Sequence, residues 1–257
     1  MTRPNTELLT IDGRRVEVQC ARRPGPGPAI VLINGSGGPL EGWMRVWGPL
    51  TELGTVVAWN RPGLGASEPP GVDQTSQVVS LQLEAVLKAL AIPGPYMLVG
   101  HSLGGLHALH FARSHPAETM ALVLLEATAP EDVMHMPAHV SRLQRGLQAL
   151  LDRLWPPNPH SEVLHAQTSA KQLAGLPPLP PVPLAVVTGT RPALAWLTPR
   201  AQWAARCRHQ RALAQLSPRG AQVMAHRSGH FPQLSQPALV VQVIADLCRA
   251  TGSVPRA

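Results

Sequence analysis

The stretch Gly-His-Ser-Leu-Gly at 100–104 constrains the fold of this chain more than any other feature of its sequence. It directly follows the apolar run at 96–99, and the residues from 103 to 115 then carry apolar side chains at helical spacing. A serine between a buried strand and a helix must occupy a sharp turn, for which the flanking glycines leave room. The stretch therefore predicts a strand–turn–helix unit that presents Ser102 as a nucleophile.

A serine hydroxyl needs a neighbouring base before it can attack a substrate at neutral pH. His230 is predicted to be that base, because it follows the strand-like run at 221–225 and precedes a helix expected to begin at Pro237. A loop at this point can reach back to a serine at the same edge of a sheet. His226 is the alternative, but it lies at the end of the strand-like run and has less freedom to turn toward Ser102.

In combination these motifs resemble the α/β-hydrolase superfamily over residues 8–250. Two further segments carry the resemblance. Asn-Gly-Ser-Gly-Gly at 34–38 follows a strand-like run, where the family usually has His-Gly-x. The segment at 60–67 looks like the family's Asp-x-x-Gly-x-Gly-x-Ser, with Asn60 in place of the aspartate.

The resemblance implies an α/β-hydrolase fold, with a mostly parallel central sheet, helices on both faces and a small helical cap. It also implies that the backbone N–H groups of Ser36 and Leu103 form an oxyanion hole, where two donors would stabilise the transition state.

The acid of a Ser-His-acid triad is missing from its usual place in the family. That place follows the strand before the last one, here 182–188, yet Gly-Thr-Arg-Pro comes next at 189–192. No aspartate or glutamate occurs anywhere between Glu162 and Asp246. The charge that orients the base must therefore come from an earlier strand.

Glu126 is the predicted acid, because it follows the fully apolar strand-like run at 121–125. This position resembles that of the acid in haloalkane dehalogenases. A carboxylate at the end of this strand would orient the imidazole of His230 and stabilise its protonated form. Glu131 and Asp132 are the alternatives, although charges at the start of a helix also complement its dipole.

The length of 257 residues and a hydrophobic share of 44% predict one large core in a single α/β-hydrolase domain over 1–257. Within it, 130–181 is expected to be a cap insertion with a helix at 161–173 and a proline-rich connector back to the sheet. Trp43, Met134 and Met136 are predicted to line an apolar substrate pocket.

Composition excludes several other classes of function. The formal charge of +7 comes from scattered arginines without interleaved aromatic residues, which argues against a nucleic-acid partner. The densest group is expected on a surface helix and comprises Arg200, Arg206, Arg208 and Arg211. The absence of an apolar run of 18 residues and of a signal-like N-terminus predicts a cytoplasmic protein with no membrane partner. The three widely spaced cysteines do not suggest a disulfide framework or a metal site.

These residues predict acyl transfer from a small-molecule, ester-like substrate to water. Ser102 would attack the carbonyl, His230 would take its proton, and the amides of Ser36 and Leu103 would hold the oxyanion. No cofactor is required. The same residues also suit a lactonase, thioesterase, aminopeptidase, carbon–carbon bond hydrolase or cofactor-free haloperoxidase. A non-catalytic ligand-binding protein of the same fold is a further alternative.

Overall fold

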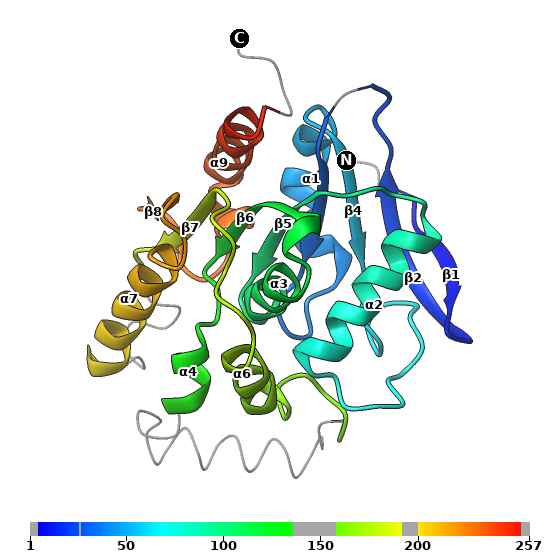
Figure 1. Ribbon diagram of the computed structural model, residues 1–257, viewed down its shortest axis with the longest axis horizontal. Coiled ribbons are helices and arrows are strands. Elements are labelled where there is room, and N and C mark those ends of the chain that lie inside the picture. The colour runs from blue at the N-terminus through cyan, green and yellow to red at the C-terminus, as the bar shows by residue number, and fades with distance from the viewer. Residues whose placement is uncertain (1–4, 26, 136–157, 192–199, 253–257) are drawn as a thin grey trace.

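A twisted sheet of eight strands lies between two layers of helices in the computed structural model, which describes residues 5–25, 27–135, 158–191 and 200–252 (Figure 1). The strand order is β1-β2-β4-β3-β5-β6-β7-β8. Strand β2 is antiparallel to both neighbours, and the pairs from β4 through β8 are parallel. The strands are β1 (Glu7–Ile11), β2 (Arg14–Ala21), β3 (Ala29–Ile33), β4 (Thr55–Trp59), β5 (Tyr96–His101), β6 (Thr119–Leu125), β7 (Leu184–Gly189) and β8 (Gly220–Ala225).

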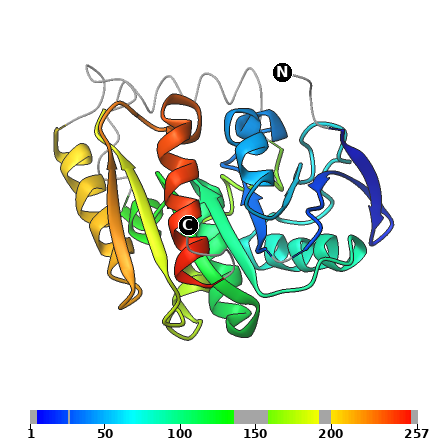
Figure 2. The ribbon, with the colours of Figure 1, turned by 90° about the horizontal axis from the view of Figure 1, so that it is seen from above.

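Helices cover both faces of this sheet, as expected from the sequence. Helices α2, α3 and α7 pack on one face, and α1 and α9 lie side by side on the other (Figure 2). The helices are α1 (Met44–Thr51), α2 (Ser76–Ala89), α3 (Leu103–Ser114), α4 (Pro130–His135), α6 (Ala166–Ala174), α7 (Arg200–Ala214), α8 (Pro232–Ser235) and α9 (Pro237–Ala250), with 3-10 helices η1 (Leu40–Trp43) and η2 (Pro116–Glu118). None of the helices within the described ranges is both long and apolar enough to span a bilayer.

The sequence of β3 shows why the sheet is buried on both sides. All five of its residues are buried. Because successive side chains point to opposite faces, Val31 and Ile33 pack toward α2 and α3, whereas Ile30 and Leu32 pack toward α1 and α9. A strand covered on both faces therefore appears in the sequence as a continuous apolar run. The predicted fold class, a mostly parallel sheet with helices on both faces, is confirmed.

Helices α4 and α6 lie in the segment between β6 and β7, where the sequence predicts a cap, and they pack against each other. Helix α6 begins at Ala166, later than the expected start at Ser161. The residues before it form turns instead, in which Ser161 N–H donates to Asn158 at 2.8 Å and Leu164 N–H donates to Ser161 at 3.1 Å. Residues 136–157 of the expected cap lie outside the described residues.

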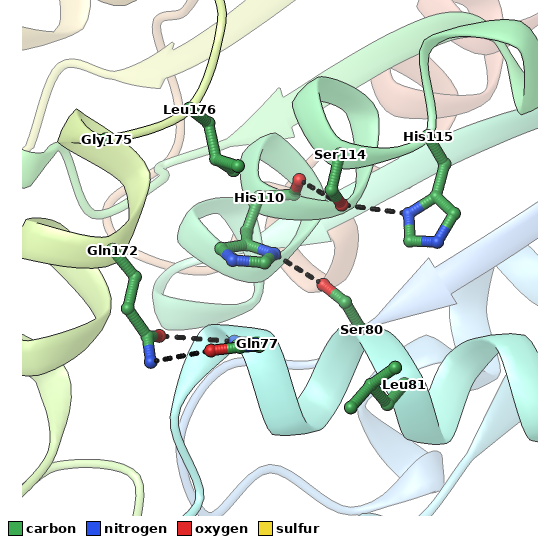
Figure 3. A pocket seen from close by; sticks show the side chains of 9 residues that line it. All are labelled: Gln77, Ser80, Leu81, His110, Ser114, His115, Gln172, Gly175 and Leu176. Atoms are coloured by element: carbon green, nitrogen blue, oxygen red, sulfur yellow. Dashed lines mark hydrogen bonds between the residues drawn. The ribbon is translucent and has the colours of Figure 1, made fainter.

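Helix α3, which starts at the predicted nucleophile, is held to α2 by two buried Ser–His contacts. Ser76 Oγ lies 2.8 Å from His107 Nδ1, and Ser80 Oγ lies 2.8 Å from His110 Nδ1. The second contact borders a surface hollow of about 330 Å³ between α2, α3 and α6 (Figure 3). This hollow is near the C-terminal end of α3, and Ser102, His230 and Glu126 are not among its lining residues. It is therefore separate from the predicted site.

Acid should destabilise this fold before its carboxylates titrate. Burial lowers the pKa of both His101 and His110 to about 4, compared with about 6.5 in the unfolded chain. Below pH 6.5 the unfolded state binds protons that the folded state excludes, so stability falls as the pH drops from 6.5 to 4. We expect both histidines to contribute to this loss. Urea denaturation across this pH range measures it.

The matched variants for this experiment are His110→Gln and His226→Gln. The first removes a buried titrating ring and should flatten the pH dependence of the urea midpoint. The second replaces an exposed histidine and controls for the substitution itself. Equal slopes for wild type and His110→Gln would contradict the prediction.

Candidate active site

The turn between β5 and α3 holds Ser102 in a strained backbone conformation. Its φ of 52° and ψ of −123° lie in a region that residues with a side chain rarely adopt, at a cost of about 1–3 kcal/mol. Close packing around the turn requires the flanking glycines. A Cβ atom at Gly104 would lie 2.2 Å from the Ile33 carbonyl oxygen, and one at Gly100 would lie 2.6 Å from the Gly104 oxygen. Ser102 is thus fixed at the carboxyl end of β5, as the sequence predicts.

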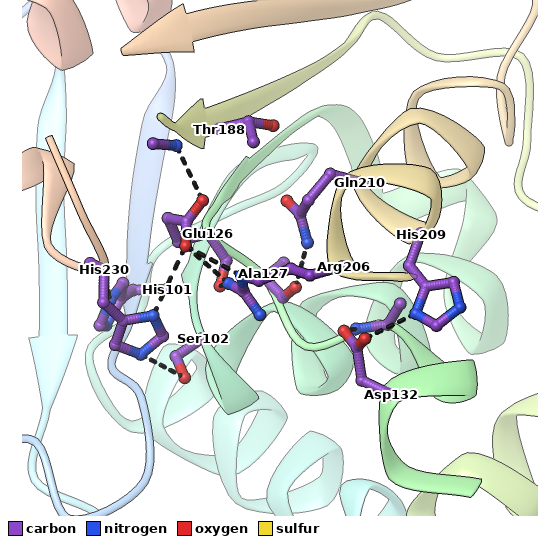
Figure 4. A network of polar contacts seen from close by, with 12 residues as sticks. His101, Ser102, Glu126, Ala127, Asp132, Thr188, Arg206, His209, Gln210 and His230 are labelled. Atoms are coloured by element: carbon purple, nitrogen blue, oxygen red, sulfur yellow. Dashed lines mark hydrogen bonds and ion pairs between the residues drawn. The ribbon is translucent and has the colours of Figure 1, made fainter. Parts of the chain in front are cut away.

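His230 lies next to this serine, in the loop between β8 and α8. Its Nε2 atom is 3.0 Å from Ser102 Oγ (Figure 4). The alternative, His226, is exposed at the end of β8. The structure therefore brings together the serine and the histidine that the sequence selected.

His101, which sequence reasoning had not singled out, supports the backbone of that loop. Its Nε2 lies 2.7 Å from the carbonyl oxygen of His230, and the two ring centroids are 4.9 Å apart. Because burial lowers the pKa of His101 to about 4, its ring is neutral at pH 7. A neutral ring that donates to a carbonyl must carry its proton on Nε2. His101 therefore ties β5 to the loop that carries His230.

Glu126 follows β6 directly and is 3% exposed. Its Oε1 accepts a hydrogen bond of 2.7 Å from the backbone N–H of Gly189, at the end of β7. The strand end where the family usually has the acid thus gives the Glu126 carboxylate a backbone donor. Glu126 Oε2 lies 3.7 Å from His230 Nδ1, close enough for an ion pair but too long for a hydrogen bond. Such contacts often tighten only when substrate is bound.

The charge on Glu126 is set by competing effects. Burial by itself would raise the pKa of this carboxyl, but His230 and Arg206 outweigh it and hold the pKa below its usual value. Glu126 is therefore ionised at neutral pH. The alternative Asp132 faces another partner, with Oδ1 at 2.6 Å from His209 Nδ1. The other alternative, Glu131, is exposed.

Helix α7 presents three polar side chains to the loop after β6. Arg206 binds Glu126, His209 pairs with Asp132, and Gln210 Nε2 donates to the carbonyl oxygen of Ala127 at 2.6 Å. The four arginines lie on a helix with an exposed face, as expected, but the Arg206 side chain turns toward Glu126 and is 25% exposed. The spacing of i, i+3 and i+4 places the three polar residues on one helix face, which is a signal that the sequence contains.

The loop at 34–38 lies against the nucleophile. A Cβ atom at Gly35 would be 3.0 Å from the Cβ atom of Ser102, and Gly38 N–H donates to the Gly35 carbonyl at 3.1 Å to close a tight turn. Within the described ranges, the backbone N–H groups of Ser36 and Leu103 have no hydrogen-bond acceptor. Both predicted oxyanion donors are thus available in segments adjoining Ser102.

Asn60, where the family usually has aspartate, fits its surroundings as an amide. Its Oδ1 accepts a hydrogen bond of 3.1 Å from Leu40 N–H, and its Nδ2 donates to Glu17 Oε2 at 2.7 Å. An aspartate here would face Glu17 with a like charge and without that donor. The substitution is therefore matched by a neighbouring carboxylate.

Arg61, next to Asn60, connects the loop at 34–38 to the segment after residue 157 through a buried ion pair. Arg61, 1% exposed, places Nε at 2.5 Å from Glu162 Oε1 and Nη2 at 3.0 Å from Glu162 Oε2. Nη2 also donates to the Gly35 carbonyl at 2.8 Å. His107 Nε2 lies 3.7 Å from Glu162 Oε2. Burial would raise the pKa of Glu162, but Arg61 and His107 lower it to about 2, so the pair is charged.

The three predicted pocket residues are placed differently. Trp43 is fully buried in the core shared by α1 and α9, so the expectation that it lines the pocket is not supported; its 3-10 helix turns the ring toward the sheet. Met134 lies on α4 with 44% of its surface exposed. Met136 lies outside the described residues.

Comparison with known proteins identifies a matching family and similar sequences. Residues 30–243 match the sequence model described as the alpha/beta hydrolase family. The chain is 35% identical over 136 residues to RutD of Variovorax paradoxus, whose name provisionally assigns carbamate hydrolysis; the match covers 52% of this chain and 48% of RutD. It is 31% identical over 147 residues to the uncharacterized protein Rv2715 of Mycobacterium tuberculosis, covering 57% and 42% of the two chains. The matched stretches thus span just under half the length of these curated relatives.

Solved structures resemble the chain over nearly its whole length. The enol-lactonase from Burkholderia xenovorans LB400 superposes with a TM-score of 0.68 at 20% identity, covering 94% of this chain and 99% of the lactonase. Cfl2 from Burkholderia cenocepacia gives a TM-score of 0.70 at 20% identity, covering 95% of each chain. At this identity the likeness shows a shared fold.

Proposed function

This chain belongs to the alpha/beta hydrolase family, and from that premise we propose that it is a serine hydrolase that cleaves an ester-like bond of a small molecule. The observation that carries the proposal is the 3.0 Å contact between Ser102 Oγ and His230 Nε2 at a strained turn. Strain of this kind persists only where surrounding packing enforces it, and it occurs preferentially at functional sites.

In the proposed reaction, His230 Nε2 accepts the hydroxyl proton as Ser102 Oγ attacks the substrate carbonyl. The electron pair of the carbonyl moves onto its oxygen, which the backbone N–H groups of Ser36 and Leu103 stabilise. Each such donor contributes about 3 kcal/mol to transition-state binding. As the tetrahedral intermediate collapses, His230 returns the proton to the leaving alcohol, and Ser102 retains the acyl group.

Water then completes the cycle by the same steps. His230 removes a proton from the water, which attacks the acyl carbonyl, and Ser102 Oγ leaves with that proton. Glu126 stays ionised throughout, orients His230 through Nδ1 and stabilises the imidazolium that forms in each half-reaction. These residues perform every proton transfer, so the proposal needs no cofactor.

We further propose that the chain is a single catalytic domain in which residues 130–181 form a cap beside the site. Two observations support this. The segment starts at α4, a few residues after Glu126, and Glu162 within it is tied to the Gly35 loop through Arg61. Met134 on α4 would then contribute apolar surface for the substrate.

A fluorophosphonate probe tests the proposal, because it phosphonylates only an activated serine. We expect the protein to gain one adduct, which peptide mass spectrometry assigns to Ser102. Turnover assays with esters, lactones, thioesters and carbamates as substrates would then define the bond that is cleaved. A wild-type protein that takes up no probe would overturn the proposal and favour a ligand-binding role for the fold.

Glu126→Gln should slow this labelling at least about 100-fold at pH 7.5, because the neutral amide neither stabilises the imidazolium nor selects the correct tautomer. The matched control is Glu131→Gln, which removes an exposed carboxylate five residues further on. Labelling rates measured by intact-mass spectrometry compare the two variants. Equal rates in both would exclude Glu126 as the acid.

A further inference from the structure

The guanidinium of Arg206 contacts both the side chain and the backbone of Glu126. Its Nη2 atom lies 2.7 Å from Oε2 and 3.0 Å from the carbonyl oxygen, and its Nε lies 3.2 Å from Oε2. Gly189 N–H occupies the other carboxylate oxygen at 2.7 Å. Oε2 is therefore shared between Arg206 and His230, as Figure 4 shows.

We propose that Arg206 is a positioning residue for the displaced acid, fixing the Glu126 carboxylate toward His230 and setting the pH range in which this pair is active. This inference rests on the proposed function. It goes beyond the triad because neither the motifs nor the usual acid position involves helix α7.

The backbone of Glu126 explains why a second anchor is needed. Its φ of 47° lies in the left-handed region, which is unfavourable for a residue with a side chain. The usual acid would sit one strand further along, so this carboxylate must reach its histidine from an atypical strand end. The planar, forked guanidinium of Arg206 binds the carbonyl oxygen and the carboxylate of Glu126 together, and so it holds the main chain and the side chain of Glu126 in one arrangement.

The charge of Arg206 also acts on Glu126 and His230. Four titratable groups lie around Glu126 and its partner His230. They are Arg206 from α7, His101 from β5, and the paired Asp132 and His209 from α4 and α7. His101 is neutral at pH 7, and His209 is paired with Asp132. Arg206 is therefore a fixed positive charge beside the pair, and it opposes uptake of a further proton.

The test uses Arg206→Gln, which loses the charge, and Arg206→Lys, which keeps the charge but loses the fork. In Arg206→Gln we expect the acid limb of the pH profile for probe labelling to move up by about one pH unit, because the pair takes up its proton more readily. In Arg206→Lys the limb should stay near its wild-type pH while labelling slows. A purely structural role would lower the rate at every pH without moving the limb.

The matched control is Arg208→Gln, an exposed arginine on the same helix, which should change neither the rate nor the limb. A second measurement does not depend on activity: NMR titration of the ¹³C-labelled Glu126 carboxyl should show a pKa that rises in Arg206→Gln. An unlabelled wild type would overturn the proposed function, and the carboxyl titration would still decide whether Arg206 controls the charge of Glu126. An unchanged limb and an unchanged titration in Arg206→Gln would overturn this inference.

Discussion

Ser102→Ala should lower kcat for hydrolysis of an ester substrate by about five to six orders of magnitude and leave the fold intact. The variant removes the only atom that the proposed mechanism joins to the acyl group, so His230 and the oxyanion donors have no covalent intermediate to act on. Alanine keeps the Cβ atom, and the close packing of Gly100 and Gly104 maintains the turn. The measurement is steady-state turnover of the substrate found by profiling, together with the thermal unfolding midpoint.

Ser114→Ala is the matched control, since Ser114 lies at the other end of α3 and its hydroxyl contacts His110, Phe111 and His115. It should retain turnover close to that of the wild type. Ser102→Ala with more than a few per cent of wild-type turnover and a native unfolding midpoint would exclude Ser102 as the nucleophile.

Glu162→Gln should reduce the free energy of unfolding by about 3–5 kcal/mol at pH 7. The substitution leaves the Arg61 guanidinium, which is 1% exposed, as an uncompensated buried charge. Urea denaturation at pH 7 measures the loss. The pKa of about 2 for Glu162 gives a second check. A carboxyl whose pKa is lower in the folded state than in the unfolded chain, where it is near 4.5, stabilises the fold at pH values above 4.5. In the wild type this contribution should disappear as the pH falls from 4.5 toward 2.

The double variant Arg61→Met/Glu162→Met separates the effect of the ion pair on protein stability from its effect on the position of the Gly35 loop. Replacing both charges with apolar side chains of similar size should restore most of the lost stability. It also deletes the donor to the Gly35 carbonyl, so we expect labelling of Ser102 to remain slower than in the wild type. A double variant as unstable as Glu162→Gln would show that the ion pair is not the source of the loss.

Local patterns account for the parts of the fold that the sequence predicted well. The runs at 29–33 and 121–125 are apolar at every position, and the structure shows both within strands buried on both faces. The elbow at 100–104 required a strand before it and a helix after it, and these are β5 and α3. Such features depend on neighbours in the chain, so spacing alone reveals them.

The polar partners of the site had no comparable signal. Arg61 and Glu162 are separated by 101 positions, and Arg206 and Glu126 by 80. Their pairing depends on which helix covers which strand end. The helical spacing of Arg206 with His209 and Gln210 marks a polar face, but it does not say whether water or protein covers that face. For Trp43 the sequence predicted a pocket residue because it follows the glycine loop, but its side chain is buried in the core.

The sequence by itself determined the strand–turn–helix unit around Ser102 and the apolar runs at 29–33 and 121–125 that form buried strands. It also indicated the chain segments that hold His230 and Glu126. Those features follow from periodic burial and from glycine at positions where packing leaves no room for a side chain. Only the tertiary structure decided that Gly189 donates to the Glu126 carboxylate, that Arg206 and His230 both contact this carboxylate, and that Arg61 joins Glu162 to the Gly35 loop. Contacts between distant segments form when the sheet and its helices assemble. The partner of a charged side chain depends on this packing, and no local sequence pattern encodes it.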